Sequence, residues 1–494
     1  MSLRLYNTLG RTVEEFTPVK PGEAGFYGCG PTVYNYAHIG NLRAYVTHDL
    51  LCRVLRERGY TVKRVMNITD VGHLSGDDDS GEDKMVKSAA ERGKTVLEIA
   101  DFYTRAFFND TERMNILRPS VVCKATEHIE EMIALIRRIE EKGFTYTAGG
   151  NLYFDISRFP GYGDLALLRM DELKAGARTG VDTGKRNGGD FVLWFTKSKF
   201  ENQALLWDSP WGRGYPGWHI ECSAMSIKYL GEQFDIHAGG LAHVPVHHPN
   251  EIAQSEAATG KRPWVRYWVH NEFLVLDRGK MSKSAGGFLT LQSLVDRGFD
   301  PLDYRYFLLG GHYRSQLQFS WESLEGAKNA RRSLTERLRA LGAQTRSAQA
   351  QAANVPVSGA PATETAAPGP DAPVRERLAA FHEALDDDLS SPRALAELWG
   401  LLKDSSLPPG DAAWAVSRMD RVLGLNLGDA LAGPGETPAD PALAAEIEGL
   451  VARRAEAKAA GDYGRADAIR SELAGRGIIL EDGKNGTAWR FKPA

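Results

Sequence analysis

The sequence predicts an α/β fold: a Rossmann-like parallel-sheet domain with an insertion, followed by an α-helical bundle and a small C-terminal module. Residues 25–68 show strand, helix and strand patterns in succession, helical periodicity dominates after residue 321, and a segment rich in Ala and Pro separates the two halves. The 494-residue chain also exceeds what one hydrophobic core usually serves, since domains average about 150 residues. The chain is therefore expected to contain several domains.

The predicted parallel sheet begins with a strand, a helix and a second strand. The strands at residues 25–33 and 60–68 are short runs of apolar, aromatic and β-branched residues. The apolar residues between them recur every three or four positions, as in a helix: Ile39, Leu42, Val46, Leu50 and Val54. A strand, crossover helix and strand in succession predict parallel pairing.

Further along, helices are predicted at residues 95–118 and 128–142, and a Gly-rich stretch at 175–190 is predicted to be a surface insertion. The segment 342–373, mostly Ala, Pro, Thr, Ser and Gln, has the composition of a flexible linker. A helical pair at 442–459 and 463–475 and a small hairpin end the chain. The expected limits are 1–325 for the parallel-sheet domain with an inserted region at about 120–210, 326–341 for a helical stem, 342–373 for the linker, 374–432 for the bundle and 442–494 for the C-terminal module.

Composition indicates a globular protein, because hydrophobic residues make up 43% and charged residues 25%. No apolar run is long enough for a signal peptide or a membrane span, so we expect a cytoplasmic protein with no membrane partner. The four cysteines, Cys29, Cys52, Cys123 and Cys222, are too scattered for a disulfide framework and are expected to be reduced, structural or metal-bound. Net charge is −4, yet residues 451–494 hold nine Lys or Arg against six Asp or Glu, a local patch that suits a polyanion.

A phosphate-binding turn is predicted where the first strand ends in residues 28–31 and His38, Gly40 and Asn41 open the helix. Amide groups at a helix N-terminus are unpaired and attract anions, and Gly40 has no Cβ to block a nucleotide. His38 can donate to phosphate oxygens as well. The same residues also suit a capped helix beside a glycine turn, so this turn by itself does not establish phosphate binding.

A second candidate is the lysine loop at residues 280–284, KMSKS, which has glycine on both sides. Its Lys280 and Lys283 can close over a triphosphate and neutralise the charge that develops as pyrophosphate leaves. Taken alone, a short lysine loop is more often a solvated surface loop.

A third candidate is a zinc site made of Cys29, Cys222, His247 and Glu251. His247 and Glu251 lie one turn apart on one face if residues 247–258 are helical. Scattered Cys and His residues usually belong to the core or the surface, so spacing alone does not establish a metal.

The motifs together resemble a known family. HIGN at the first strand-to-helix turn and KMSKS more than 200 residues later resemble the signatures of class I aminoacyl-tRNA synthetases. Over most of residues 28–284, the chain resembles cysteinyl-tRNA synthetases in particular, through GCGPTVYNYAHIGN, PGWHIECSAMS, FDIH, HHPNEIAQSEAATGK and KMSKS.

The resemblance implies a cysteine–tRNA ligase that uses ATP and Mg²⁺ to convert L-cysteine into cysteinyl-AMP and transfers it to the terminal adenosine of tRNA-Cys. A monomer is implied as well. The implied site residues are His38, Asn41, Lys280 and Lys283 for catalysis, Gly40 with His38 and both lysines for ATP, Thr69, Trp218 and His237 around the cysteine side chain, and Cys29, Cys222, His247 and Glu251 for one Zn²⁺ per chain.

A metal suits the specificity that such an enzyme needs. Serine differs from cysteine by one atom, and a pocket selects between such near-isosteres by shape only roughly 100-fold. Zinc binds a thiolate at about 2.3 Å and strongly prefers it to an alcohol. Because four protein ligands are already expected, zinc must expand its coordination or loosen one ligand, such as Glu251, when cysteine binds.

The chain departs from the family at several positions. Where the family commonly reads GGGLDLIFPHHENE, residues 238–251 read AGGLAHVPVHHPNE, so Ala242 and Pro249 each replace an acidic residue. The loss at Ala242 removes a contact that the family makes to the nucleotide or the pocket. After KMSKS, residues 285–287 read AGG where LGN is commoner.

The C-terminal third resembles RNA-binding modules. Residues 388–395 sit in a predicted helical segment that resembles the DALR-type anticodon-binding bundle, and the terminal stretch resembles the anticodon-binding module of bacterial cysteinyl-tRNA synthetases. Arg465, Arg470, Trp489 and Arg490 suit phosphate contact and base stacking on tRNA. The charges also suit a solvated helix face.

Three other functions compete with this prediction. A cysteine ligase of mycothiol synthesis activates cysteine likewise but has a shorter chain without the terminal RNA module. A noncatalytic RNA-binding or regulatory paralog is expected to lose His38, Lys280 or a zinc ligand, and all are present. A small-molecule nucleotidyltransferase needs neither the zinc residues nor the helical tail.

Overall fold

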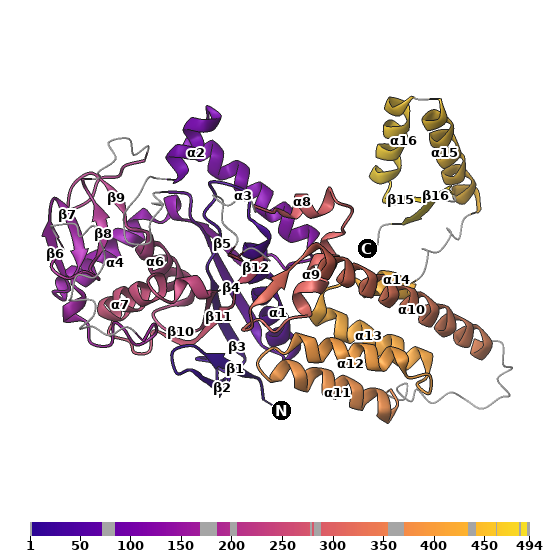
Figure 1. Ribbon diagram of the computed structural model, residues 1–494, viewed down its shortest axis with the longest axis horizontal. Helices are drawn as coiled ribbons and strands as arrows, with labels where there is room; N and C mark the ends of the chain where they lie inside the picture. Colours follow the sequence, from indigo (N-terminus) through magenta and orange to yellow (C-terminus); the bar gives the residue numbers. More distant parts are fainter. Residues whose placement is uncertain are drawn as a thin grey trace. The chain divides into compact units, whose positions relative to one another are not determined.

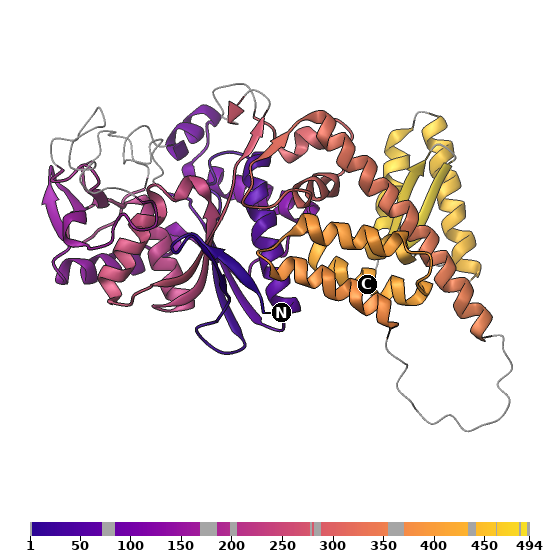
Figure 2. The ribbon, with the colours of Figure 1, turned by 60° about the horizontal axis from the view of Figure 1, so that its bottom comes forward.

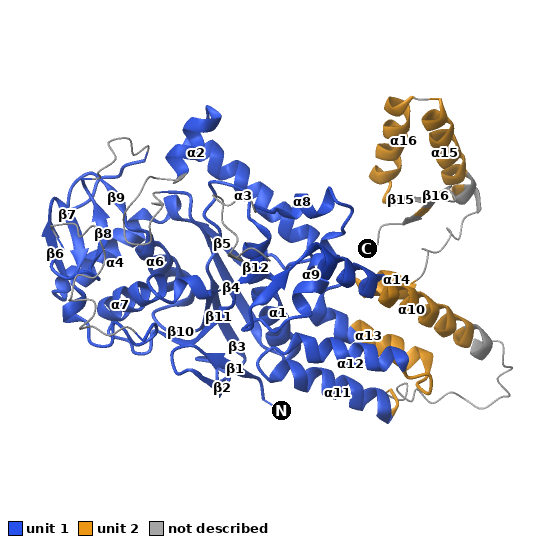
Figure 3. Cartoon of the chain, in the orientation of Figure 1, with its two compact units in different colours: residues 1–332, 372–403, 418–425 blue, residues 333–371, 404–417, 426–494 orange. Residues whose placement is uncertain are grey.

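The computed structural model describes residues 2–71, 84–167, 185–197, 205–276, 279–280, 288–353, 370–432, 441–460, 462–483 and 486–491. The chain divides into two compact units, which Figure 3 shows in blue and orange. Unit 1 comprises residues 1–332, 372–403 and 418–425, and unit 2 comprises residues 333–371, 404–417 and 426–494.

A five-stranded parallel sheet forms the centre of unit 1, in the order β11-β10-β3-β4-β5. Its strands are β3 (Glu23–Gly28), β4 (Thr61–Ile68), β5 (Val121–Lys124), β10 (Phe234–Gly240) and β11 (Val265–Asn271). The α/β class and the first βαβ unit are confirmed, with α1 (Ile39–Glu57) as the crossover helix. In open parallel sheets, ligands bind at the carboxyl ends of the strands where the strand order reverses, here between β3 and β10.

Helices cover both faces of this sheet (Figures 1 and 2). One side carries α4 (Ile129–Glu141), α6 (Trp218–Leu230) and α7 (His247–Thr259), with α6 packed on β3 and β4. The other side carries α1 and α9 (Pro301–Leu309), with α1 packed on β4, β10 and β11. The site residues on α1 and α6 are thus held from opposite faces of the sheet.

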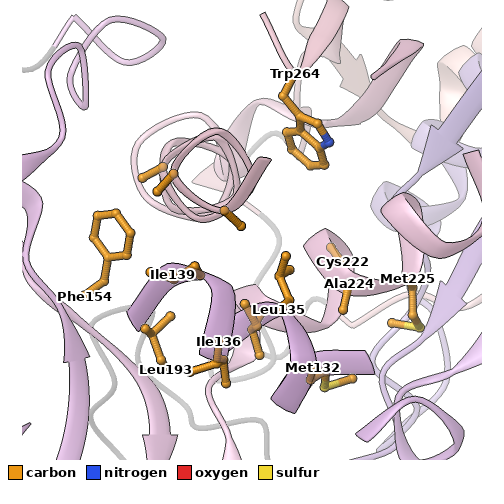
Figure 4. Close-up of a cluster of buried hydrophobic side chains, with 14 of the residues drawn as sticks. Met132, Leu135, Ile136, Ile139, Phe154, Leu193, Cys222, Ala224, Met225 and Trp264 are labelled. Carbon is orange, nitrogen blue, oxygen red and sulfur yellow. The ribbon is translucent and has the colours of Figure 1, made fainter. Parts of the chain in front are cut away.

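The main hydrophobic core lies between α4, α6, α7 and the sheet. Figure 4 shows Leu135 and Ile136 of α4 beside Cys222, Ala224 and Met225 of α6. Both Cys222 and Cys29 belong to this core cluster, so their backbone positions are fixed by packing.

The inserted region is smaller than expected at about 120–210. An antiparallel sheet forms it: β6 (Thr145–Ala148), β7 (Asn151–Phe154), β8 (Phe191–Phe195) and β9 (Tyr215–Pro216). Residues 121–124 instead form β5, the edge strand of the parallel sheet. They pair parallel with residues 65–68 of β4. Of the surface insertion predicted at 175–190, residues 175–184 lie outside the described part of the chain.

The remaining elements of unit 1 surround this framework. The helices predicted at 95–118 and 128–142 are confirmed with shorter limits as α3 (Val96–Arg113) and α4. The other elements are β1 (Arg4–Asn7), β2 (Thr12–Glu15), α2 (Lys84–Arg92), β12 (Leu274–Leu276), β13 (Gly279–Lys280), α8 (Leu291–Val295), β14 (Leu317–Phe319), α11 (Ala372–Asp386) and α12 (Ser391–Lys403).

The predicted linker 342–373 begins too early. Helix α10 (Trp321–Ala353) continues through Gly342, because Ala and Gln favour helix and no proline occurs before Pro356. Within unit 2, Gly342 lets the backbone of Leu431 approach so closely that a Cβ would lie 2.0 Å from its carbonyl oxygen. Gly342 is therefore a packing residue.

The predicted bundle at 374–432 is divided between the units. Residues 372–403 and 418–425 belong to unit 1, where Arg58 donates two hydrogen bonds to Asp386. The DALR-like residues are only partly helical: Asp388 and Leu389 have positive φ of 56° and 57° and form the turn before α12. Asp388 accepts hydrogen bonds from Tyr313 and Arg314, which explains why a turn stands there.

Unit 2 contains a small module with its own core. Besides α13 (Pro409–Leu423), which spans both units, and α14 (Leu427–Ala432), it includes α15 (Pro441–Ala459), α16 (Tyr463–Gly475), β15 (Ile478–Gly483) and β16 (Gly486–Phe491). β15 and β16 pair antiparallel, as predicted for the terminal hairpin. Ile447, Leu450, Ile469 and Leu473 pack the helical pair together.

Candidate active site and metal centre

A cavity of about 440 Å³ opens at the carboxyl ends of β3, β10 and β11. Residues that follow these strands line it, together with the start of α1 and the first turn of α6. Of the sequence-predicted residues, Cys29, His38, Gly40, Asn41, Thr69, Trp218, Cys222 and His247 line this one cavity.

The start of α1 is a capping box. His38 is the N-cap: its Nδ1 accepts from the Asn41 N–H at 3.0 Å, and Asn41 Oδ1 accepts from the His38 N–H at 3.2 Å. Because Nδ1 is an acceptor, the proton of the neutral ring is on Nε2, which makes Nε2–H a donor. A Cβ on Gly40 would lie 3.1 Å from the His38 ring, so glycine leaves room for this ring. The Asn41 carboxamide oxygen is therefore part of the N-terminal cap of α1.

Both flanks of the lysine loop are anchored near α1. Lys280 ends β13, which pairs with β12, whereas Lys283 lies outside the described residues. On the far side of the loop, the Ile39 N–H donates to Leu289 O at 2.8 Å, and the Phe288 ring meets His38 edge to face at 5.9 Å. The fold therefore brings the segments flanking KMSKS to the HIGN turn.

The four predicted zinc ligands converge. One ligand atom from each of Cys29, Cys222, His247 and Glu251 lies within 4.8 Å of the others, and all four side chains are buried. Cys29 follows β3, Cys222 comes from α6, and His247 and Glu251 lie one turn apart on α7. Gly30 fixes the turn after Cys29, since a Cβ there would lie 1.7 Å from Asn67 O.

The pKa values of the two thiols in this cluster shift in opposite directions: the hydrogen bond with Cys29 and burial raise the pKa of Cys222 well above its usual range. A hydrogen bond with the Cys222 thiol is the main cause that holds the pKa of Cys29 well below its usual range. Burial opposes ionisation of His247, but the Glu251 carboxylate, whose Oε1 lies 3.0 Å from His247 Nε2, and Cys29 outweigh it and raise its pKa to about 10. This cluster holds a proton that a divalent cation would displace.

A second set of atoms, from Cys29, His237, His248 and Glu251, also lies within 4.8 Å. His237 and His248 do not line the cavity among the described residues. His248 Nδ1 is 2.7 Å from His270 Nε2, and the ring of His237 stacks on Trp268 at 4.6 Å. Of this set only Cys29 lines the cavity, whereas Cys29, Cys222 and His247 of the first set do, which makes the first set the more accessible to a substrate.

The three residues expected around the cysteine side chain differ in position. The ring of Trp218 stacks on His247 with centroids 4.3 Å apart. The Thr69 hydroxyl, also at the cavity, donates to Glu221 Oε2 at 2.9 Å. His237 instead lies behind Glu251, with its Nε2 2.9 Å from Glu251 Oε2. His237 therefore contacts a predicted zinc ligand, and its expected place around the cysteine side chain stays a prediction.

Two supporting residues were missed from the sequence. Glu221 is buried, and burial raises its pKa well above the usual range. His219 Nδ1 lies 2.8 Å from His247 Nδ1. Both residues belong to the segment PGWHIECSAMS. Two ionisable residues in an otherwise apolar helix start could have indicated them from the sequence, because buried charged groups need partners.

The two departures from the family lie in this region. Ala242 lines the cavity, in the short 3-10 turn Leu241–His243 that follows β10. Pro249 is in the first turn of α7, where its missing N–H removes no helical hydrogen bond. Residues 285–287 are outside the described residues.

The predicted RNA-binding residues belong to the terminal module. Arg465 and Arg470 are exposed on α16, and Arg490 stands in β16. Trp489 is partly buried and packs against the core cluster of Ile447 and Leu473. The tryptophan thus has a packing role in the module.

Comparisons with known proteins identify the family of this chain. A family model described as tRNA synthetases class I (C) catalytic domain matches residues 15–329, and one described as cysteinyl-tRNA ligase anticodon binding domain matches residues 440–490. The cysteine–tRNA ligase of Treponema denticola is 58% identical over 99% of this chain and 100% of its own. Cysteine–tRNA ligase 1 of Burkholderia lata is 46% identical over 98% of this chain and 96% of its own.

Among solved structures, methionyl-tRNA synthetase of Mycobacterium tuberculosis bound by methionyl-adenylate has a TM-score of 0.54 and 17% identity, covering 83% of this chain and 90% of its own. This likeness supports the class I fold. Within the described part of the chain, no helix combines the length and apolarity needed to cross a bilayer.

Proposed function

Because the chain belongs to the cysteinyl-tRNA synthetase family and is thereby a class I cysteine–tRNA ligase, we propose that its cavity binds cysteine through zinc and ATP through the start of α1. The reaction activates cysteine with ATP and transfers it to tRNA. The observation that carries the site assignment is the convergence of four buried zinc-type ligands at a cavity that the capped end of α1 also lines.

The residues present fit zinc. Two thiols, an imidazole and a carboxylate are a donor set that zinc favours, and Glu251 Oε1 lies 3.0 Å from His247 Nε2 inside this cluster. When bound, zinc stabilises a thiolate, which selects cysteine over serine. Cys29, Cys222, His247 and Glu251 would hold it, one ion per chain. Cys29, Cys222 and His247 face the cavity, so the thiol of the substrate can approach them.

We assign the phosphates of ATP to the N-terminus of α1. The His38 Nε2–H and the first amide groups of α1 are donors, and Gly40 lets a nucleotide approach the backbone. The carboxylate of cysteine attacks the α-phosphorus, and pyrophosphate leaves. Lys280 and Lys283 stabilise the charge that develops on the pentavalent phosphorus and the pyrophosphate, together with Mg²⁺. Asn41 acts by fixing the His38 ring.

Trp218 and Thr69 shape the part of the cavity next to the metal ligands. Trp218 holds the His247 ring by stacking, which leaves this ligand one orientation. Thr69 is fixed by Asn67 and Glu221, so its side chain presents a defined surface to the substrate. His237 acts on cysteine indirectly, by orienting Glu251.

We propose that the terminal module contacts tRNA-Cys through Arg465, Arg470 and Arg490, with Trp489 chiefly holding the hairpin on the helices. The exposed positions of Arg465 and Arg470 on one helix support this. We further propose a cytoplasmic monomer, which light scattering of the purified protein and localisation in cells would test.

The test is cysteine-dependent ATP–pyrophosphate exchange with serine as competitor, on protein whose zinc has been quantified, with tRNA charging measured in parallel. Near-stoichiometric zinc, exchange that requires cysteine, and charged tRNA are expected. Zinc-depleted protein should keep its fold and lose the preference for cysteine over serine. Exchange without charging would contradict the tRNA assignment, and equal use of serine by the zinc-loaded enzyme would contradict the role of the metal.

A further inference from the structure

Few negatively charged side chains line the cavity among the described residues. Ala242 lines it with only a methyl group. Among the described residues that line the cavity, Glu272 is the one carboxylate, and neither Lys nor Arg lines it. ATP and cysteine both bring hydrogen-bond donors, so this carboxylate is the natural acceptor.

The register of the sheet puts Glu272 beside the turn that holds Ala242. β10 and β11 are parallel neighbours in which Gly240 pairs with Asn271, the last residue of each strand. Leu241 and Glu272 are therefore the first residues beyond the paired ends of two neighbouring strands. The end of β11 thus brings a carboxylate to the side of the cavity that the turn after β10 lines.

The backbone at Glu272 is held rigidly. Its N–H donates to Tyr313 O at 2.8 Å, and Arg43 of α1 donates to the next carbonyl, Phe273 O, at 2.6 Å. Glu272 Oε2 accepts from the Phe273 N–H at 2.8 Å, which fixes the side chain. No hydrogen bond joins Oε1 to another residue that the structure describes.

The geometry points to the ribose of ATP as the ligand of Glu272. We propose that its carboxylate accepts hydrogen bonds from the two ribose hydroxyls. This rests on the assignment of the phosphates to α1. Leu274, two residues beyond Glu272, is the neighbour of Gly40: a Cβ on Gly40 would lie 3.8 Å from the Leu274 Cβ. A nucleoside whose phosphate lies at Gly40 therefore has Glu272 within reach.

The alternative ligand is the ammonium group of cysteine. Cys29 follows β3, two strands from β11, which is a separation of about 10 Å across the sheet. The ammonium is only two bonds from the carbon that carries the thiol, so it stays near the zinc ligands. The strand separation therefore favours the ribose.

The experiment compares ATP, 2′-deoxy-ATP and 3′-deoxy-ATP in cysteine-dependent pyrophosphate exchange, for the unmodified enzyme and the variants Glu272→Ala and Glu272→Gln. Removing hydrogen bonds to a charged acceptor costs roughly ten- to a hundredfold in kcat/KM. The unmodified enzyme should prefer ATP to both deoxy analogues by that factor. Glu272→Ala should lower kcat/KM for ATP more than for either analogue, because each analogue has only one of the two hydroxyls to lose, and should thereby remove the preference for ATP, with Glu272→Gln in between. Glu141→Ala, at an exposed glutamate of α4, is the control and should leave the preference unchanged.

Zinc content and the KM for cysteine show whether each variant keeps a folded site. A raised KM for cysteine with an intact ribose preference would overturn the proposal in favour of the ammonium. Normal exchange with no preference for ATP over the deoxy analogues would overturn the role of Glu272 and leave the proposed function standing. No exchange by the unmodified enzyme would contradict the proposed function itself.

Discussion

The imidazole of His237 and the carboxylate of Glu251 form a fully buried contact, with Nε2 2.9 Å from Oε2 and both side chains 0% exposed. The other carboxylate oxygen, Oε1, lies 3.0 Å from His247. His237 thus holds one carboxylate oxygen of Glu251, and the second oxygen faces another predicted zinc ligand. The orientation of Glu251 therefore depends on His237, which does not line the cavity.

His237→Phe should therefore weaken zinc binding. Phenylalanine keeps the stack on Trp268 but cannot hydrogen-bond Glu251, and loss of such a supporting contact typically costs 10- to 100-fold in metal affinity. Zinc retained after dialysis against a graded chelator measures the change. His128→Phe is the control, since His128 is also buried and bonded, to Lys124 O and Tyr229, away from the metal ligands. Equal zinc retention by the two variants would contradict the supporting role.

Lys280→Ala should slow adenylate formation far more than it weakens cysteine binding. The lysine is proposed to act on charge that exists only in the transition state, where loss of one such group costs about 100- to 1000-fold in rate. Single-turnover formation of cysteinyl-AMP and equilibrium binding of cysteine separate the two effects. Equal losses in both measurements would show that Lys280 serves binding.

Arg305→Met should destabilise unit 1. Arg305 is fully buried, pairs with Asp49 at 2.6 Å and donates to Leu423 O and Met114 O, so it joins α9 to three other segments. Breaking a buried pair leaves Asp49 short of a partner and costs about 3–5 kcal/mol. Denaturant unfolding measures the loss of free energy.

The matched control is Arg393→Met, which breaks the ion pair with Asp387 at 2.7 Å, where both side chains are more than half exposed. Its expected cost is below about 1 kcal/mol. Similar losses for the two variants would contradict the buried network as a source of stability.

Asp110→Asn should stabilise the protein at high pH only. Burial raises the pKa of Asp110 from 3.8 to about 6, so the folded state holds a proton that the unfolded state releases earlier. Stability is therefore lost as pH rises from about 4 through 6, and the neutral asparagine removes this loss. The melting temperature of the variant should exceed that of the unmodified protein at pH 8 and match it near pH 4. A pH-independent difference would rule out ionisation as the cause.

Local patterns were sufficient for much of the fold. The apolar spacing in residues 39–54 predicted α1, and the β-branched runs on either side predicted β3 and β4, since side-chain periodicity reports which face is buried. The HIGN turn was readable because His38, Gly40 and Asn41 act within one helical turn of each other. Such short-range features are determined by the sequence alone.

Composition was misleading where packing outweighed it. The Ala-rich residues from Gly342 to Ala353 have linker composition, yet they extend α10, because Gly342 packs closely against Leu431 and Arg346 donates to Leu431 O. The composition of residues 342–353 does not show this packing, because it depends on a contact with a segment almost 90 residues away along the chain.

The sequence by itself determined the family and the helix-start motif. The tertiary structure decided which residues come together: it placed His237 in contact with Glu251, and Ala242 and Glu272 in the lining of one cavity. These positions depend on the register between β10 and β11 and on how α6 and α7 pack on the sheet. Contacts between residues far apart in the chain arise only when the sheet and its helices assemble, and spacing along the sequence cannot encode them.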